Sequence, residues 1–409
     1  MAFANGIVES CFMTQVMIAG GGIGGLSAAL ACSRGGLRVS LFERAEVFSE
    51  VGAGIQLGPN AMRVLFGWGL EPELMQVVAL PKQLQVRSAV SGRVLGELPL
   101  GEAANKRYGA PYATVHRADL HGLLVKVLQD QTDAQLHLGA VVQGVQQGDL
   151  GVTLQLAGEP AIEGDILVAA DGGFSTLRQQ LLADGLPQPT GHLAYRAMVL
   201  QAELPQTLRS QQVTAWLGPR LHVVQYPVRG GEWLNVVAIV HGKAQGDMAH
   251  WDHSANAEDL QHAMSAVCAP LQDLIKAIGH WRLWPLSIRP PMRSAAQQAC
   301  GRVALLGDAA HPMVPYLAQG AAMAIEDAAC LAQVLSKSDV SQHPVTQMLQ
   351  TYASRRWQRN AQVQSRAIRN GEVFHATGLQ RFGRDLAMRL LGDRLLDQPW
   401  LYAGGPVAV

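Results

Sequence analysis

The chain has 409 residues, and its 32 lysines and arginines balance its 32 aspartates and glutamates. This balance argues against nucleic acid or an anionic membrane surface as the main partner. Hydrophobic residues make up 48% of the chain and charged residues 16%, which indicates a folded protein with a large core and no disordered tract.

The cysteines give no sign of disulfides or of a metal centre. The five of them are scattered and form neither a CxxC pair nor a zinc-binding spacing. Residues 16–31 are apolar but fall short of the roughly 20 residues of a membrane span. The first twelve residues show no signal-peptide pattern, and Met13 could be the natural start. We therefore expect a cytoplasmic protein with no metal and no membrane span.

Residues 16–43 carry the strongest motif. An apolar run leads into glycines at positions 20, 22 and 25, then into a helical pattern and a second apolar run that ends at Glu43. This is the β-α-β fingerprint of dinucleotide binding. Its glycines permit a tight turn and a close backbone approach to a pyrophosphate, and its acid binds the ribose. The helix N-terminus adds N–H donors and a partial positive charge.

The next stretch is a glycine-rich loop, 51–60, in which Asn60 could cap a helix that reaches Phe66. Its glycines suggest backbone lying against something flat, although a flexible surface loop is the alternative. Residues 84–98 predict a hairpin. A strong helix follows, with Arg117 at its start and Asp119 as a plausible cap.

Strand-like runs at 136–145, 152–156 and 166–170 continue the α/β pattern, and it resumes with a strand at 302–306. Helices are expected at 320–335 and 345–370, the second with its arginines on a polar side. Between about 190 and 288 the chain reads as successive strands followed by a helical stretch at 257–277, which predicts a second sheet. We expect a discontinuous nucleotide-binding domain (13–80, 100–188 and 286–370), a β-rich substrate domain (81–99 and 189–285) and a C-terminal segment (371–409).

Three motifs each follow an apolar strand: Gly20–Gly25, Asp171–Arg178 and Gly307–Pro312. All three can lie at the carboxyl ends of one sheet, where open α/β folds bind ligands. The ordered set GxGxxG, DGxxSxxR and GDAAHP resembles the group A flavoprotein aromatic hydroxylases over nearly the whole chain. The resemblance implies an α/β fold with a Rossmann-like FAD-binding domain, an inserted β-sheet domain and C-terminal helices.

The resemblance also implies roles for particular residues. Glu43 and Arg44 would hold the ADP half of FAD, Arg117 the pyrophosphate or ribityl region, and Asp308 the ribityl chain. The first backbone N–H groups of the helix at 320–335 would face the flavin pyrimidine edge, where reduced flavin is negative. The full implied set is Gly20, Gly22, Ile23, Gly25, Glu43, Arg44, Gly54, Gln56, Arg117, Val142, Asp171, Asp308, Gly320 and Ala321.

A stable nicotinamide site is not expected, because no second GxGxxG follows a strand. In the family that the chain resembles, NADH or NADPH binds transiently in a groove, and the sequence does not choose between them. Asp171 and Arg178 belong to the motif that touches both the FAD pyrophosphate and this path. A surface ion pair is the alternative for Arg178.

The inserted domain should supply the substrate site. The family reaction uses a flavin C4a-hydroperoxide and O2 to hydroxylate an electron-rich ring, so a base near a phenol is expected. His222 and Tyr226, four apart on one strand, share a face and resemble the pair that handles the phenol in 3-hydroxybenzoate 6-hydroxylases. A core histidine with satisfied ring nitrogens is the alternative for His222.

Two positions depart from the relatives. Gln56 stands where 6-hydroxynicotinate 3-monooxygenases carry a catalytic histidine, and Pro315 stands where 3-hydroxybenzoate 6-hydroxylases carry a glutamine. We expect Pro315 and Tyr316 to contact the substrate. Arg196 and Arg289 are candidate grips for a substrate carboxylate, although both also fit the family scaffold.

The sequence therefore predicts a monooxygenase that hydroxylates a phenolic aromatic acid such as a hydroxybenzoate, acting with a small substrate and O2 and with a homodimer as one possible state. A halogenase is disfavoured, because the chain offers only Trp281-Arg282-Leu283-Trp284-Pro285 in place of that group's Trp-x-Trp-x-Ile-Pro signature. An epoxidase or hydroxylase of a polycyclic or isoprenoid substrate stays open, as does a flavin-binding protein without turnover. His311 is expected to pack and cap rather than to catalyse.

Overall fold

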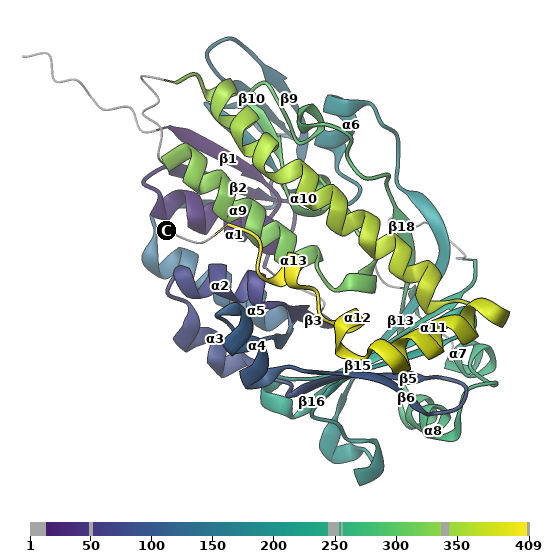
Figure 1. The fold of residues 1–409 in the computed structure, drawn as a ribbon. Helices are drawn as coiled ribbons and strands as arrows, with labels where there is room; N and C mark the ends of the chain where they lie inside the picture. Colours follow the sequence, from purple (N-terminus) through teal and green to yellow (C-terminus); the bar gives the residue numbers. More distant parts are fainter. Residues whose placement is uncertain (1–13, 49–51, 244–252, 255–256, 337–342, 407–409) are drawn as a thin grey trace, which may run out of the picture.

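A mostly parallel sheet forms one end of the molecule and a mostly antiparallel sheet the other, in a computed structural model that describes residues 14–48, 52–243, 253–254, 257–336 and 343–406 (Figure 1). The first sheet has the strand order β19-β20-β12-β1-β2-β8, parallel except at the β19–β20 edge. Its strands are β1 (Gln15–Ala19), β2 (Arg38–Glu43), β8 (Gln135–Leu138), β12 (Ile166–Ala169), β19 (Ala299–Cys300) and β20 (Val303–Leu305).

Alternation along β1 explains why both faces of this sheet are covered. Val16 and Ile18 pack with helices α1 (Ile23–Arg34), α5 (Arg117–Gln131) and α9 (Gly320–Ser336). Met17 and Ala19 point the other way, onto a three-stranded sheet of β9 (Val142–Gln147), β10 (Val152–Leu156) and β11 (Ile162–Gly164). Residues Val16–Ala19 of β1 are thereby fully buried.

The second sheet has eight strands in the order β17-β18-β13-β16-β15-β14-β5-β6. Leu221 and Val223 of β15 lie on its outer face and pack against α7 (Ala257–Ala263) and α8 (Ala269–Ala277). The inner face turns toward the parallel-sheet half of the molecule. The strands are β5 (Gln83–Ser88), β6 (Val94–Pro99), β13 (Gln188–Leu200), β14 (Val213–Gly218), β15 (Leu221–Val228), β16 (Trp233–His241), β17 (His253–Ser254) and β18 (Arg282–Ile288).

The long helix α10 (Val345–Phe374) runs along the side of the molecule from one sheet to the other (Figure 1). The C-terminal helices then pack near β6, and no helix of the described ranges has the length and apolar character to cross a membrane. The remaining elements are β3 (Gly54–Leu57), α2 (Pro59–Gly67), α3 (Glu71–Val77), β4 (Val78–Ala79), α4 (Gly101–Tyr108), β7 (Ala113–His116), α6 (Thr176–Leu182), α11 (Gly378–Leu391), α12 (Asp393–Leu396) and α13 (Pro399–Tyr402), with short 3₁₀ turns including Gly307–Ala309 and Pro315–Leu317.

Most expected elements are present, but two predicted caps are wrong. The hairpin at 84–98 is β5–β6, and the four strand-like runs between 193 and 240 are β13 to β16. Asp119 lies inside the first turn of α5, where it pairs with Arg229, and the residue at the cap position is His116. Asn60 follows Pro59 within α2, and its amide donates to Glu326 instead. The proposed start at Met13 lies outside the described residues.

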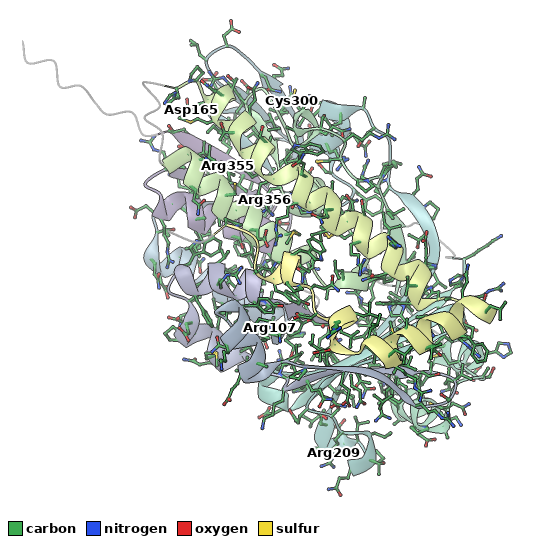
Figure 2. The ribbon with its side chains drawn as sticks, in the orientation of Figure 1. Arg107, Asp165, Arg209, Cys300, Arg355 and Arg356 are labelled. Carbon is green, nitrogen blue, oxygen red and sulfur yellow. The ribbon has the colours of Figure 1, made fainter. Side chains whose placement is uncertain are left out.

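The polar side predicted for α10 also needs correction, because it faces a buried pair of acids on α9. Arg356 is 2% exposed, and its guanidinium contacts Glu326 Oε2 at 2.8 Å and Asp327 Oδ1 at 2.7 Å. Arg359 adds a 2.7 Å contact to Glu326. Figure 2 labels Arg355 beside Arg356 on α10, but only Arg355 of these two is exposed.

Asp327 also holds the loop that follows β20. Its Oδ2 lies 2.6 Å from His311 Nε2 and accepts a hydrogen bond from Gly307 N at 3.3 Å. Burial alone raises the pKa of the Asp327 carboxyl, but the charges of His311 and Arg356 outweigh burial and lower it to about 2. The acid is therefore an anion that ties α9, α10 and this loop together.

We predict that Asp327→Asn lowers the free energy of unfolding at neutral pH by about 3–5 kcal/mol, because the buried Arg356 loses one of its two anionic partners and keeps only Glu326. Urea unfolding measures the loss. Arg355→Ala is the matched control on the exposed side of the same helix and should change stability by no more than about 0.5 kcal/mol.

The difference in stability between wild type and Asp327→Asn should depend on pH. A carboxyl with a depressed folded-state pKa contributes its full stability above its ordinary value of 3.8 and loses it as the pH falls through about 2. The gap in urea midpoint between wild type and Asp327→Asn should therefore narrow below about pH 4. A gap that stays constant down to pH 2 would contradict a native-state anion at Asp327.

Candidate active site

The three glycine- and aspartate-containing motifs meet at the carboxyl edge of the parallel sheet. A Cβ placed on Gly20 would lie 2.3 Å from the carbonyl oxygen of Ala170, which precedes Asp171. A Cβ on Gly24 would lie 3.0 Å from Leu306 and 3.3 Å from Ala324. Segments separated by nearly 300 residues are therefore in contact, as the order of apolar strands predicts.

The glycines of the first motif have distinct reasons to be glycine. Gly20 has a φ of 107°, a left-handed conformation that side chains disfavour. A Cβ on Gly25 would come within 1.8 Å of the Gly20 carbonyl oxygen, so α1 packs directly on the turn. At Gly22, the cap of α1, an added Cβ would meet no described atom within 4 Å. The start of α1 thus presents its backbone N–H groups to open space, which fits an anionic group there.

Glu43 ends β2 beside this turn. Its carboxylate accepts hydrogen bonds from Gly21 N at 2.6 Å and Ala45 N at 2.9 Å. The backbone of Ala140 donates to the Glu43 carbonyl at 2.9 Å, which brings the loop before Val142 alongside. Arg44 is exposed next to this group. Glu43 and Arg44 therefore lie beside the turn before α1, and the loop that leads to Val142 runs alongside Glu43.

Two aspartates, Asp171 and Asp308, follow the other strands at the carboxyl edge of the parallel sheet. Asp171 accepts a hydrogen bond from Leu177 N at 3.3 Å, while its Oδ1 is buried without a partner among the described residues. Burial raises its pKa. Asp308 is exposed between buried neighbours, and its Oδ1 lies 3.9 Å from the position that a Cβ on Gly320 would take. Gly320 begins α9, so Asp308 and the first N–H groups of that helix, including Ala321, lie side by side. These polar groups fit the ribityl and pyrimidine parts of FAD.

Arg178 is not a surface residue. Its side chain is 3% exposed, pairs with Asp184 at 2.7 Å and donates to the backbone carbonyls of Ala309 and Ala310. Arg289 pairs with the other oxygen of Asp184 at 2.9 Å and is likewise buried. The two arginines share one acid, so Arg289 already has a carboxylate partner within the protein.

The inner face of the eight-stranded sheet carries a group of polar side chains among Ala194, Val237 and Ile239. The alternation of the strands puts two of these polar residues on this face from each of β13, β15 and β16. They are His192, Arg196, His222, Tyr226, Asn235 and His241. Opposite them lie β3, the turn at Pro315–Leu317 and the residue after α10.

His222 and Tyr226 share this face, as predicted, but contact different segments. His222 is buried, with its Nδ1 2.7 Å from His375 Nε2 and its ring 5.0 Å from that of Tyr316. Burial, then His375 and His192, lowers its pKa well below the ordinary value. Tyr226 donates its hydroxyl to the Gly54 carbonyl at 2.6 Å, and burial raises its pKa.

Gly54 connects this face to the nucleotide-binding half. Its N–H donates to Asn235 Oδ1 at 2.7 Å, and a Cβ there would lie 2.7 Å from the Tyr226 ring. Gln56, two residues on, accepts from the hydroxyl of Tyr112 at 2.6 Å. The glycine-rich loop thus ends in a packed strand and is not a flexible surface loop over its described part. Arg117 follows His116, and its N–H donates to the Ala53 carbonyl at 3.1 Å.

Arg196 is half-buried and differs from the buried Arg178 and Arg289. No carboxylate of the described residues forms an ion pair with it, and its Nε is buried without a hydrogen-bond partner. Its guanidinium lies 5.0 Å from the centre of the Trp284 ring, close enough to Tyr226 and Arg117 to interact with their charges. Burial lowers its pKa. Such a group needs an anion.

The tertiary structure adds His192, His241, His375 and Asn235, which sequence reasoning missed, and gives contacts for the predicted Tyr316. Tyr316 bonds through its hydroxyl to His192 Nδ1 at 2.6 Å, and His375 contacts both His222 and His241. These histidines have no motif in common, so no sequence signal brings them together. Asn235 could have been found from the sequence, because it interrupts an apolar strand and an amide buried there needs a hydrogen-bond partner. Pro315 opens the turn that carries Tyr316.

Comparison with known proteins adds the family. The family described as FAD binding domain matches residues 13–367. A 3-hydroxybenzoate 6-hydroxylase of Polaromonas naphthalenivorans is 35% identical over 95% of each chain. A 6-hydroxynicotinate 3-monooxygenase of Bordetella bronchiseptica is 36% identical over 86% of this chain and 89% of its own. A salicylate hydroxylase substrate complex superposes with a TM-score of 0.79, at 27% identity and 96% coverage of both chains.

The match to the FAD family spans most of the chain, and the relatives match it almost end to end. The carboxyl edge of the parallel sheet offers the donors and the open helix N-terminus that FAD needs. The chain belongs to the group A flavoprotein hydroxylases and is an FAD-dependent aromatic monooxygenase.

Proposed function

We propose that this monooxygenase hydroxylates a phenol that carries a carboxylate, using O2 and either NADH or NADPH. The observation that carries the proposal is Arg196, a half-buried arginine on the inner sheet face whose buried Nε has no hydrogen-bond partner and whose guanidinium has no acid partner among the described residues. A carboxylate would satisfy it through two parallel hydrogen bonds. The relative from Polaromonas naphthalenivorans is named for a hydroxybenzoate, which supports the same substrate class.

Bound FAD supplies electron transfer from the nicotinamide and activation of O2. We assign its adenosine half to the side of Glu43, Arg44 and Val142, and its pyrophosphate to the N-terminus of α1 near Arg117. Asp308, Gly320 and Ala321 would meet the ribityl chain and the pyrimidine edge. Gly20, Gly22, Ile23, Gly25, Gly54, Gln56 and Asp171 complete the set and surround the same space.

We further propose that His222 takes the phenolic hydrogen of the substrate and that Tyr226 positions the ring. Both lie on the sheet face opposite Tyr316, and apolar neighbours on that face keep water away from the reacting carbon. Pro315 and Tyr316 would line the opposite side of the pocket. We base the carboxylate anchor on Arg196 and not on Arg289, because Arg196 lies on the inner sheet face with His222 and Tyr226, whereas Arg289 is paired with Asp184.

Three wider expectations stay predictions. We propose that the eight-stranded sheet with α7 and α8 forms the substrate domain, since residues 81–99 and 189–285 supply its strands up to Pro285. A cytoplasmic location is supported by the four described cysteines, all of which are free thiols. A homodimer would be tested by analytical ultracentrifugation.

The decisive experiment is a screen of aromatic acids for stimulation of NADH and NADPH oxidation by the FAD-loaded enzyme, with product analysis. We expect a hydroxybenzoate-like acid to stimulate oxidation and to be hydroxylated. Stimulation by neutral polycyclic or isoprenoid compounds alone would overturn the proposed substrate class. If neither NADH nor NADPH bleached the flavin, the proposal that the protein uses a nicotinamide as reductant would be wrong.

Glu43→Ala should weaken FAD binding by about 10- to 100-fold, because a carboxylate hydrogen bond to a hydroxyl is worth about 1.5–3 kcal/mol. Flavin fluorescence titration of the apoprotein measures the Kd. The exposed Glu46→Ala is the matched control and should bind as wild type does. Yellow protein with an unchanged Kd would remove Glu43 from the site.

Removing the proposed phenol contacts should uncouple the enzyme. His222→Ala is expected to slow hydroxylation by about 10²- to 10⁴-fold while FAD stays bound and hydrogen peroxide release rises. Tyr226→Phe should do so more mildly, since it deletes one hydroxyl. Peroxide formed per nicotinamide consumed is the readout, with the exposed His280→Ala as control. Unchanged coupling in both variants would exclude the pair from the mechanism.

Arg196→Ala should raise the Kd for a carboxylate-bearing ligand by about 30-fold or more, since losing one partner of a buried charge pair costs about 2–5 kcal/mol. The same phenol without its carboxylate should bind wild type and variant equally. Arg93→Ala, on the exposed surface, is the control. Equal losses for both ligands would mean that Arg196 supports the fold and not the carboxylate.

A further inference from the structure

Three histidines that the proposed chemistry does not use lie together beside His222, at the edge of the inner sheet face. His192 comes from β13, His241 from the end of β16, and His375 directly follows α10. One ring nitrogen from each of these three lies within 4.8 Å of the other two. The cluster is therefore assembled from three segments that are distant in sequence.

In two of these rings, one nitrogen is already hydrogen-bonded to a residue outside the cluster. Tyr316 Oη lies 2.6 Å from His192 Nδ1, and His222 Nδ1 lies 2.7 Å from His375 Nε2. This leaves Nε2 of His192 and Nδ1 of His375 for the centre of the cluster. His241 points its Nε2 there, 3.0 Å from His375 Nδ1. Histidines that bind metals have this arrangement, in which a second group holds the other ring nitrogen and fixes the tautomer.

We propose that His192, His241 and His375 bind one divalent transition-metal ion of the Zn²⁺ class. Three neutral imidazoles with no carboxylate suit Zn²⁺, Cu²⁺ or Ni²⁺ and do not suit Mg²⁺ or Ca²⁺, which prefer oxygen ligands. His241 is exposed, so a water molecule can complete a tetrahedral site from that side.

The electrostatic surroundings agree with neutral ligands. Burial, then His241, lowers the pKa of His192 to about 4, and burial, then the neighbouring histidines, lowers that of His375 to about 3. The positive charges nearby are Arg220, which acts on His241, and Arg384, which acts on His375 and is paired with Asp385 at 2.7 Å. A neutral imidazole has one nitrogen with a lone pair and one N–H, so the group behind each ring decides which nitrogen can bind a metal.

A metal at this position would join β13 and β16 to the end of α10. Metal–nitrogen bonds of about 2.0–2.1 Å would draw the three nitrogens closer than they lie now, which the exposed ring of His241 can accommodate. With its Nδ1 on the ion, His375 would carry its proton on Nε2 and donate it to His222 Nδ1. His222 would then keep its own proton on Nε2 and could not take a phenolic hydrogen, so a bound ion would inhibit hydroxylation. The site is thus a structural clamp on the C-terminal end of α10, and it does not depend on the identity of the substrate.

The test is calorimetric titration of the FAD-loaded, chelator-treated enzyme with Zn²⁺, together with the melting temperature at each Zn²⁺ concentration. We expect one bound ion per chain and a melting temperature that rises with Zn²⁺, because a ligand that binds only the folded state stabilises it. Mg²⁺ should give neither effect.

Variants locate the ion. His241→Ala alters an exposed side chain, so the protein should fold but lose the binding heat, whereas His280→Ala, an exposed histidine outside the cluster, should bind as wild type does. Tyr316→Phe should weaken binding by about 10- to 100-fold, as loss of an orienting partner does. Equal Zn²⁺ affinity in wild type and His241→Ala, or no saturable binding at all, would overturn the site.

Discussion

The arrangement of this protein depends on two adjacent acids in the middle of a buried helix. Glu326 and Asp327 are fully buried on α9, and their charges are matched by Arg356 and Arg359 of α10 and by His311 of the loop after β20. Desolvating so many ionised groups is costly, so the network holds only while every partner stays in place. That requirement fixes the N-terminus of α9, and with it the position of Asp308 and Gly320 at the carboxyl edge of the parallel sheet.

The second constraint is contact between the two sheets. Gly54 receives the hydroxyl of Tyr226 on its carbonyl and gives its N–H to Asn235, so a strand of the nucleotide-binding half is bonded directly to the inner face of the antiparallel sheet. A side chain on Gly54 would collide with both residues. The polar residues on this face are consequently held at a fixed distance from the cofactor half, which a reaction between two bound molecules requires.

Buried arginines show how the same residue type takes different roles. Arg178, Arg289 and Arg356 each have an acid within 3 Å, and they join segments of the fold. Arg196 has an aromatic ring beside it and no acid among the described residues. A guanidinium left in this state is expensive unless a ligand supplies the charge. Arg178, Arg289 and Arg356 are buried beside acids, whereas Arg196 is half-buried with its Nε unpartnered, so the surroundings and not the residue type set the role.

The sequence by itself determined the fold class, the cofactor and the meeting of three motifs, because glycine spacing and apolar strands act locally and the carboxyl ends of parallel strands share one edge. It also placed His222 and Tyr226 on one face, since strand alternation is fixed. Only the tertiary structure decided which arginines are neutralised, that Asn60 and Asp119 are not caps, and that His192, His241 and His375 lie together. Those outcomes depend on pairings between different elements of the fold that no local motif sets, such as Asp119 with Arg229 and Asn60 with Glu326, and the free energy of a buried charge is set by its neighbours in space.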